Sequence, residues 1–514
     1  MTMQVHLLVP GAMYLDGGSP ASRALVGIPP CVKQFLRQGM TPPTTFVLPD
    51  TYVRRGIPQV ALEFFFYHFL FVQGKAFGKL AADARLVVVG TSAQLARART
   101  LLTHALAGPS IEEMAAWTDA SGRPAMTPGA IAMLRSYRAW FAPKRAMVHG
   151  DGDAMHRCAC NESAMYALDD VVEWRTYDAE QRALLAEGVM ITRHGDDQFT
   201  VCQDDALWPI DLRDATDQLA ALIALPPQAE PRTAEMFGVH CLGADAGFEP
   251  EHPTTGFAIA LHGAWALVDT PIGAPELLAR HGMDPAEVHV IMETHGHEDH
   301  MGSALAFLLE GWTAKTAIAY VASEPVYRVC VARLAALLDL TEAAAADLLA
   351  REFRGGVHRV RPGVTYEFCG ARWQFAWTVH PVPTLGFRVT LLHRGRTYAL
   401  AYSSDTAGRH GPLGTDAMAA AGFFDPRDDP FPSLVRGDEA LVLWEAGGTH
   451  GDPIHVDVRE WELLCTAHGI DAPVAFMHTR SLPPEYHAYV LARPGWHVTL
   501  IPLPPRAPAH RLAA

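Results

Sequence analysis

This chain has no surplus of positive charge, and that absence narrows what it can bind. Lysine and arginine number 41 against 56 aspartates and glutamates, which leaves a net charge of −15. Proteins that grip the phosphates of a nucleic acid usually carry a basic surplus, so we expect no nucleic-acid polymer as a partner. A small anionic substrate stays open, because a few local cations can meet its charge.

Long apolar runs, a leader segment and a disulfide framework are also lacking. The most apolar run, Phe64 to Val72, is too short to span a bilayer. Met1 to Pro10 has neither the positive start nor the cleavage site of a signal peptide. Eight cysteines are scattered without the spacing of a disulfide framework, which favours a reducing compartment. We therefore expect a cytoplasmic protein that does not associate with membranes.

The length and composition favour a globular chain of two domains or three. It has 514 residues, of which 49% are apolar and 19% are charged, as in ordinary soluble proteins. The clearest linker is the proline-rich segment Leu225 to Pro231. We therefore predict an N-terminal domain over residues 1–230 and a second domain over residues 231–514.

The first half shows α/β patterning but no chemistry that we recognise. Leu86 to Gly90 predicts a buried strand, followed by a helix that Ser92 caps and that runs to Leu106. The aromatic residues between Phe64 and Phe71 predict a core or part of a dimer interface. Glu173 to Val201 indicates a β-rich segment with a helix at Ala179 to Ala186. We predict an accessory α/β domain that covers substrate access or mediates dimerisation.

One short cluster in this half could bind a metal. His156, Cys158 and Cys160 are ligand types, but no matching second pair stands at the spacing of a zinc site. We favour a purely structural role for them.

The second half is organised around the segment Thr294 to His300. Directly after the apolar run Val288 to Met292, it places four ligand-type residues in the order H-x-H-x-D-H. His295 and His297 are two apart, so in an extended segment both rings point to one side and can share an ion. Asp299 and His300 follow where the chain turns towards a helix, and can serve a second ion. Zinc suits these ligands, as do iron and manganese.

At these residues the chain resembles the metallo-β-lactamase superfamily, whose signature is T-H-x-H-x-D-H. The resemblance runs from near Met236 to near Pro504 and implies an αββα sandwich with two metal ions at one edge. The fold class that we expect is therefore α/β, with this sandwich after the N-terminal accessory α/β domain. The resemblance also implies that Asp269 lies behind the ligands and orients an imidazole, although a buried, turn-forming aspartate is the competing interpretation.

The remaining ligands are candidates that the resemblance implies, each after an apolar strand. His380 follows the expected strand Trp373 to Trp377 and matches the third ligand of the first ion, beside His295 and His297. Asp405 follows Tyr398 to Ser404 and can bridge both ions. His478 follows Pro473 to Phe476 and would join Asp299 and His300 on the second ion.

A further pair narrows the resemblance to the phosphodiesterase-like branch, which includes ribonuclease Z and class II cyclic nucleotide phosphodiesterases. Glu445, at the end of an apolar strand, precedes His455 by ten residues. In that branch a carboxylate holds a histidine that is not a metal ligand and that protonates or stabilises the leaving oxygen. His450 is a competing candidate, and a surface turn histidine is the alternative interpretation.

The function that we expect is dinuclear metal-dependent hydrolysis of a small phosphodiester such as a cyclic nucleotide. The resemblance implies two divalent ions, best zinc, whose bridging water becomes the attacking hydroxide while Asp299 orients it. The partner would be a small-molecule substrate, and a homodimer is common in the superfamily.

Three alternatives stay open. One is a di-iron oxygenase, like the β-hydroxylase of chloramphenicol biosynthesis, but that enzyme has a carboxylate where this chain has His380. Another is hydrolysis of a lactam, lactone or thioester by the same ligand set. The third is a metal-stabilised binding module without activity.

Overall fold

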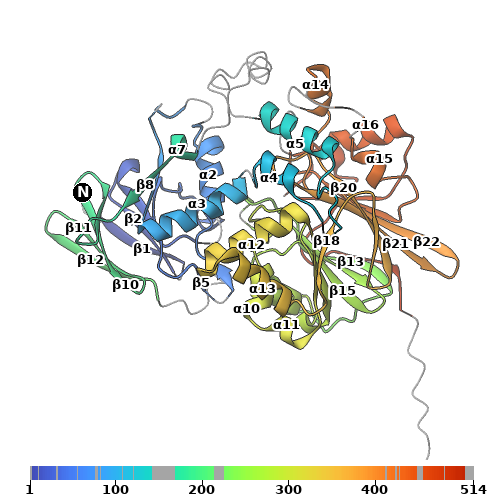
Figure 1. The fold of residues 1–514 in the computed structure, drawn as a ribbon, viewed down its shortest axis with the longest axis horizontal. Helices are drawn as coiled ribbons and strands as arrows, with labels where there is room; N and C mark the ends of the chain where they lie inside the picture. Colours follow the sequence, from blue (N-terminus) through green and yellow to red (C-terminus); the bar gives the residue numbers. More distant parts are fainter. Residues whose placement is uncertain are drawn as a thin grey trace, which may run out of the picture.

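The computed structural model describes most of the chain, in two halves joined by a short segment (Figure 1). It covers residues 3–503 except 10, 30–32, 55, 76–78, 82, 107, 120, 142–167, 214–224, 250, 411–413, 423–424, 426, 428, 449–454 and 480. His156, Cys158, Cys160 and His450, which the sequence singled out, lie outside these residues.

The N-terminal half is built on a six-stranded sheet in the order β1-β2-β3-β4-β7-β8. Its strands are β1 (Gln4–Val9), β2 (Ala12–Asp16), β3 (Arg23–Val26), β4 (Thr45–Val47), β7 (Leu86–Gly90) and β8 (Val172–Thr176). The strands from β3 to β8 run parallel. A two-stranded hairpin, β5 (Val53–Arg54) and β6 (Ile57–Pro58), follows β4. The strand predicted at Leu86 to Gly90 is confirmed as β7.

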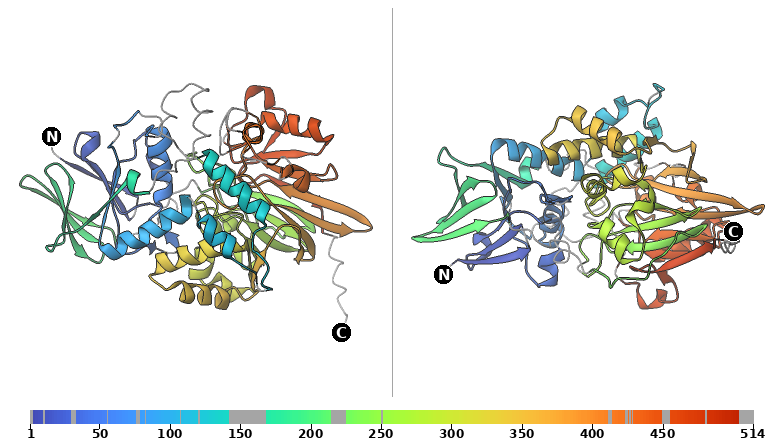
Figure 2. Two further views of the ribbon diagram at one scale, coloured as in Figure 1. Left: turned by 45° about the horizontal axis from the view of Figure 1, so that its top comes forward. Right: turned by 90° about the horizontal axis from the view of Figure 1, so that it is seen from below.

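An antiparallel four-stranded sheet packs on one face of the first (Figure 2). It consists of β9 (Arg182–Ala186), β10 (Val189–Gly195), β11 (Gln198–Gln203) and β12 (Ala206–Asp211). The helix predicted at Ala179 to Ala186 is therefore wrong. In this segment the buried residues Ala183 and Leu185 alternate with more exposed ones, which is the pattern of a strand. Pairing with β10 places both side chains against the first sheet.

Helices cover the other face of the first sheet. These are α1 (Lys33–Arg37), α2 (Leu62–Tyr67) continued by a π-turn (His68–Val72), α3 (Ser92–Leu106) and α7 (Leu168–Val171). Two further helices, α4 (Ile111–Ala116) and α5 (Pro128–Phe141), instead pack together against Trp377 of the C-terminal half. The aromatic core prediction holds for Phe64, Phe65, Phe66 and Phe69, which are buried. Ser92 is not the cap of α3: the Thr91 hydroxyl accepts the Gln94 N–H, so Ser92 is the first helical residue.

The segment predicted as a linker has neither helix nor strand and leads into the C-terminal half. The first sheet there has the order β18-β17-β16-β15-β14-β13-β26. Its strands are β13 (Phe237–Gly243), β14 (Gly256–Leu261), β15 (Ala264–Val268), β16 (Val288–Met292), β17 (Ala319–Ser323), β18 (Val357–Val360) and β26 (His497–Ile501). β15 to β18 run parallel, so their carboxyl ends meet at one edge.

The second C-terminal sheet has the order β19-β20-β21-β22-β23-β24-β25. Its strands are β19 (Thr365–Phe368), β20 (Ala371–Trp377), β21 (Leu385–His393), β22 (Arg396–Tyr402), β23 (Leu441–Glu445), β24 (Val474–Met477) and β25 (Val490–Leu491). Side chains from the inner faces of both sheets form one core, in which Trp373 and Phe257 are buried.

Helices close both outer faces of the sandwich. Over the first sheet lie α9 (Ala274–Arg280), α10 (Ala304–Leu309), α11 (Trp312–Lys315), α12 (Glu324–Leu338) and α13 (Glu342–Glu352). Over the second lie α15 (Phe431–Leu434) and α16 (Arg459–His468), with α14 (Thr415–Ala420) nearby (Figure 1). The predicted αββα sandwich with an N-terminal α/β region is confirmed. The side chains of Ser323 and Thr341 cap the starts of α12 and α13.

The two halves share a hydrophobic core. Phe64 and Phe65 of α2 and Leu101 of α3 belong to the same buried cluster as Leu334 of α12 and Leu305 of α10. Arg97 of α3 also donates to the carbonyl oxygens of Ala336 (2.7 Å) and Leu337 (3.2 Å), near the end of α12. The N-terminal half therefore packs directly on the helices that cover the first sheet of the sandwich.

Two further features bear on the expectations from composition. Cys202, Cys241, Cys330, Cys369 and Cys465 are the cysteines in the described part of the chain, and all are free. Among the described residues, no helix has both the length and the apolar character needed to cross a membrane.

Candidate metal centre

The residues that the sequence singled out meet at one edge of the sandwich, where strands of both sheets end. Asp269, His380, Asp405 and His478 each follow the last residue of a strand by at most three residues, and Glu445 is itself the last residue of β23. The segment His295 to His300 begins three residues after β16, and His455 lies ten residues after β23. From the first sheet come the segment after β16 and the residue after β15; from the second come His380 after β20, Asp405 after β22 and His478 after β24. Strand ends hold them rigidly, which suits a site of defined geometry.

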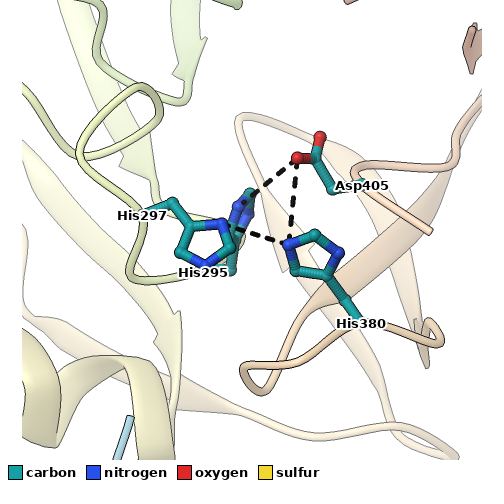
Figure 3. Close-up of side chains that lie close together, drawn as sticks. All are labelled: His295, His297, His380 and Asp405. Atoms are coloured by element: carbon teal, nitrogen blue, oxygen red, sulfur yellow. Dashed lines mark hydrogen bonds and ion pairs between the residues drawn. The ribbon is translucent and has the colours of Figure 1, made fainter. Parts of the chain in front are cut away.

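The first cluster joins three imidazoles and one carboxylate (Figure 3). Asp405 Oδ2 lies 3.7 Å from His295 Nε2 and 3.9 Å from His380 Nε2. His380 Nε2 lies 3.1 Å from His297 Nδ1. One donor atom from each of the four side chains lies within 4.8 Å of every other, so a single ion can contact them all.

The second cluster shares Asp405 with the first. Asp405 Oδ1 lies 3.3 Å from His300 Nε2, and Asp405 Oδ2 lies 3.7 Å from His478 Nε2. Asp299 Oδ2 is 4.0 Å from both of these imidazole nitrogens. Asp405 therefore stands between two sets of donors, as a bridging carboxylate would.

Burial keeps most of these imidazoles neutral, with a lone pair available. It lowers the pKa of His297 and of His478 to about 4 in each case. Burial, together with the neighbouring His300, also holds the pKa of His295 well below its usual range, and burial with His297 does the same for His380. A neutral imidazole is the form that ligates a cation.

For His300 and Asp405, the charges of neighbouring side chains outweigh the effect of burial on the pKa. Burial alone would lower the pKa of His300, but Asp405, Asp269 and Asp299 outweigh it and raise the pKa well above its usual value. Burial likewise opposes ionisation of Asp405, but His478 and His300 pull its pKa well below its usual range. The charges at this edge thus favour a cation beside Asp405, and a metal ion at His300 Nε2 would take the place of a proton.

Hydrogen bonds fix the rings of three of the imidazoles through the nitrogen that faces away from Asp405. His300 Nδ1 lies 2.8 Å from Asp269 Oδ2, and His295 Nδ1 lies 3.0 Å from the Thr294 hydroxyl, which itself donates to Asp269. His478 Nδ1 lies 2.8 Å from the Thr255 hydroxyl. Such contacts set the tautomer that leaves Nε2 for a metal.

Three residues of the site adopt left-handed backbone. Asp269, Ser404 and His478 have φ values of 51°, 52° and 64°, each just after a strand. This conformation is costly for residues other than glycine and tends to persist where the surroundings impose it, often at functional sites. Gly447 allows a close approach here, because a Cβ would lie 2.7 Å from His478 Cδ2.

Several buried atoms that could ligate a metal have no hydrogen-bond partner, and they show whether these residues fit a metal ion. His295 Nε2, His300 Nε2 and Asp405 Oδ1 are such atoms, and all three face the shared space between the clusters. Leaving a buried polar group unpaired costs about 1–3 kcal/mol, so several together require an explanation. A divalent cation satisfies them all, and the donor set fits it.

Glu445 and His455 lie beside the clusters. A Glu445 carboxylate oxygen hydrogen-bonds His455 Nδ1, and the other accepts the Thr406 N–H at 2.7 Å. His455 Nδ1 is also 3.8 Å from Asp405 Oδ2. The His455 side chain is 22% exposed, whereas that of Glu445 is 1% exposed. A buried carboxylate thus holds a histidine at the open side of the site.

The sequence did not point to every residue at the site. Thr255, which contacts His478, lies in an irregular loop with no pattern of its own. Glu63 and Tyr67 approach His297 from the N-terminal half. No local signal marks them, because their relation to the motif exists only in three dimensions.

An αββα sandwich with imidazole and carboxylate clusters at its strand ends is the architecture of a metal-binding protein of this fold. Residues 250–397 match the model of the metallo-beta-lactamase superfamily. The match includes the motif and His380 but ends before Asp405 and His478. The fold and the clusters together indicate binding of divalent metal.

Two curated relatives are phosphodiesterases of Dictyostelium discoideum. The cGMP-dependent 3',5'-cGMP phosphodiesterase A is 30% identical over 223 residues, which are 43% of this chain and 23% of the relative. The cAMP/cGMP-dependent 3',5'-cAMP/cGMP phosphodiesterase B is 27% identical over 175 residues, 34% of this chain and 15% of the relative. The chain thus spans less than a quarter of the length of either relative.

Solved structures with a similar arrangement include human tRNase Z, short form, and unliganded yeast PDE1. The first has a TM-score of 0.36 at 15% identity and covers 52% of this chain and 100% of its own. The second has a TM-score of 0.35 at 11% identity and covers 49% of this chain and 90% of its own.

Replacing Asp269 by asparagine tests whether its carboxylate supports the ligands. Asparagine tolerates left-handed backbone, so Asp269→Asn keeps the turn. Its NH2 group replaces one acceptor oxygen, so it cannot accept from the Thr294 N–H, the Thr294 hydroxyl and His300 Nδ1 together. Losing such a contact costs about 10–100-fold in metal affinity, measured by competition with a chelator. Asp339→Asn is the matched control, because Asp339 has a φ of 57° and lies far from the ligands along the chain. Unchanged affinity in Asp269→Asn would leave Asp269 as a turn residue only.

Proposed function

We propose that this protein is a metal-dependent phosphodiesterase that hydrolyses a small phosphodiester such as a cyclic nucleotide. The observation that carries the proposal is His455, an imidazole held by the buried Glu445 at the open side of the metal-ligand clusters. The leaving oxygen of a phosphodiester takes up a proton as it departs, and a positioned histidine is suited to supply it. The names of the two curated relatives support the same reaction class.

We propose two ions in the site, and zinc as their identity, because imidazole and carboxylate donors suit it. The first ion would be held by three imidazoles: His295, His297 and His380. The second would be held by a carboxylate and two imidazoles: Asp299, His300 and His478. Asp405 would contact both. When bound, such ions supply Lewis acidity towards a phosphate oxygen and a water that ionises near neutral pH.

The side chains of this chain would perform the remaining steps. Asp299, whose side chain is 12% exposed, lies at the edge of the second cluster and would accept a hydrogen bond from the attacking water, which orients it. Glu445 would keep the Nδ1 proton of His455 in place, so that the other ring nitrogen gives its proton to the leaving oxygen. The buried, strand-end ligands would exclude bulk water from the reacting groups.

The proposed substrate is a small molecule. The ligand side chains lie almost entirely beneath the surface, which suits a compact phosphodiester. The net charge of −15 disfavours a nucleic-acid polymer, whose binding draws on many lysine and arginine contacts. The homodimer expected from the superfamily stays a prediction, to be measured by light scattering.

The direct test is hydrolysis of 3',5'-cyclic GMP, 3',5'-cyclic AMP and bis(p-nitrophenyl) phosphate before and after chelation. Because bound metal contributes several kcal/mol, we expect chelation to lower kcat/KM about 1000-fold and zinc to restore it. Full turnover after metal removal would overturn the proposed mechanism. A metal-loaded enzyme that cleaves lactones or thioesters but none of these phosphodiesters would overturn the proposed substrate class.

A further inference from the structure

The ring of each ligand histidine has a second nitrogen, and that nitrogen needs a partner. For three of them the partner is a neighbour within the sandwich, at hydrogen-bond distance: Thr294 for His295, Asp269 for His300 and Thr255 for His478. These contacts hold a proton on Nδ1 and leave Nε2 for the ion. Without such a partner, nothing would keep the proton of a neutral ligand histidine off the nitrogen that must bind the ion.

His297 is oriented the other way round. Its Nδ1 faces the cluster, 3.1 Å from His380 Nε2, so its Nε2 points away from it. This Nε2 is buried and has no hydrogen-bond partner. If Nδ1 gives its lone pair to an ion, the proton of the neutral ring must sit on Nε2, which is buried away from bulk solvent. The sandwich supplies a partner to three of the other four rings, and His380 Nδ1 is buried without one. For His297 the nearest carboxylate comes from the N-terminal half.

That carboxylate is Glu63 of helix α2, in the N-terminal half. Glu63 Oε1 lies 4.0 Å from His297 Nε2, and the Glu63 side chain is 3% exposed. The distance is about one ångström longer than an N–H···O hydrogen bond. Rotation of the Glu63 carboxylate about its terminal side-chain torsion, which has a low barrier, can close this gap. A glutamate buried beside an imidazole in this way has the position of the carboxylates that orient metal-bound histidines.

The other oxygen of Glu63 ties it to the same segment. Glu63 Oε2 accepts the backbone N–H of Glu298 at 2.9 Å, the residue directly after His297. Tyr67, one helical turn along α2, places its ring edge-on to the His297 ring, with centroids 6.3 Å apart. One face of α2 thus contacts both the ring and the backbone of a metal-ligand segment more than 200 residues away in sequence.

Close packing keeps α2 at this position. A Cβ at Gly247, in the loop between β13 and β14, would lie 2.2 Å from the Phe64 ring. This loop therefore packs against α2 so closely that only glycine fits at this position. Phe64 also packs edge-on against Phe248 of the same loop. The buried Lys33 donates to the carbonyl of His252 at 2.7 Å, which fixes that loop from the N-terminal side.

We propose that Glu63 is a positioning residue of the metal centre: it accepts a hydrogen bond from the Nε2–H of His297 and so directs Nδ1 to the first ion. The N-terminal half then orients one of the metal ligands and is not merely a cover over the site. This inference rests on the proposed function, since it assumes that His297 binds a metal ion.

The test uses the full-length protein loaded with cobalt(II) or zinc. Glu63→Met removes both acceptor oxygens at nearly constant volume, and Glu63→Gln keeps one carbonyl oxygen. We expect the affinity for zinc, measured by competition with a chelator, to fall about 10–100-fold in Glu63→Met and by less in Glu63→Gln. In the cobalt-loaded protein, the paramagnetically shifted, exchangeable ring N–H proton of His297 should broaden or vanish in Glu63→Met. A general loosening of α2 would not single out that proton.

Phe65→Leu is the matched control, because Phe65 lies on α2 but packs on Phe35 and Phe46, within the N-terminal half. It should bind zinc as the wild type does. Wild-type affinity in Glu63→Met, with the His297 proton unchanged, would overturn the inference, as would an equal loss of affinity in Phe65→Leu. If Glu63→Met fails to fold, Glu63→Gln decides by the same two measurements. A wild-type protein that binds neither metal would instead overturn the proposed function.

Discussion

Asp405→Asn is expected to lower metal-dependent kcat/KM about 1000-fold, because the bound ions contribute several kcal/mol to the transition state. Asp405 lies within 4 Å of four ligand imidazoles, so its charge is the element common to both clusters. Asparagine keeps the volume but removes the charge, and it offers one oxygen in place of two. We also expect metal content to fall, measured by elemental analysis of the purified variant.

The control for this variant is Asp471→Asn, which changes an exposed carboxylate after α16. It carries the same change in net charge but lies outside the clusters. Its kcat/KM and metal content should match those of the wild type. An Asp405→Asn protein that keeps both ions and wild-type turnover would contradict the bridging role of Asp405.

His455→Gln is expected to lower kcat for a substrate with a poor leaving group about 100- to 10,000-fold, the usual contribution of a general acid. The loss should be much smaller for bis(p-nitrophenyl) phosphate, because nitrophenolate departs without needing a proton. Metal content should not change, since His455 is proposed to donate a proton and not to bind an ion. The measurement is kcat across phosphodiesters whose leaving groups differ in pKa.

His289→Gln is the matched control, because His289 is an exposed histidine on β16, the strand that leads to the ligands. Two results would contradict the general-acid role. An equal loss for all leaving groups would mean that His455 acts otherwise than by protonation. A loss of metal would make His455 a ligand, which its place beside Asp405, Glu445 and His478 also permits geometrically.

The ligand motif was predictable because its chemistry is local. His295, His297, Asp299 and His300 are close in sequence, and the strand before them is a plain apolar run. His380, Asp405 and His478 could be proposed because each follows such a strand, and the two sheets bring these strand ends to one edge. The roles of these residues still await the variants described above.

The helix expected at Ala179 to Ala186 shows where local patterning misled. Alanine and leucine favour a helix in isolation, but Ala183 and Leu185 share one face of a strand only because β10 pairs beside them. Strand formation depends on such partners more than on intrinsic preference. The cap of α3 was displaced by one residue for a simpler reason: threonine and serine stand side by side there and both can cap a helix.

Glu63 could not have been found in the sequence. Its neighbours form an aromatic run that indicates only a core, and a single glutamate among them carries no motif. Its relation to His297 depends on how α2 packs over the segment after β16, with each contact joining two halves of the chain.

Elemental analysis of the purified protein, with the visible spectrum recorded on the same sample, tests the central claim most directly. A dinuclear hydrolytic centre predicts two zinc ions per chain and no colour. Two irons with the absorption of an oxo bridge would contradict the hydrolase and favour oxygen activation at the same ligands. Less than one metal ion per chain after reconstitution would contradict the metal centre itself.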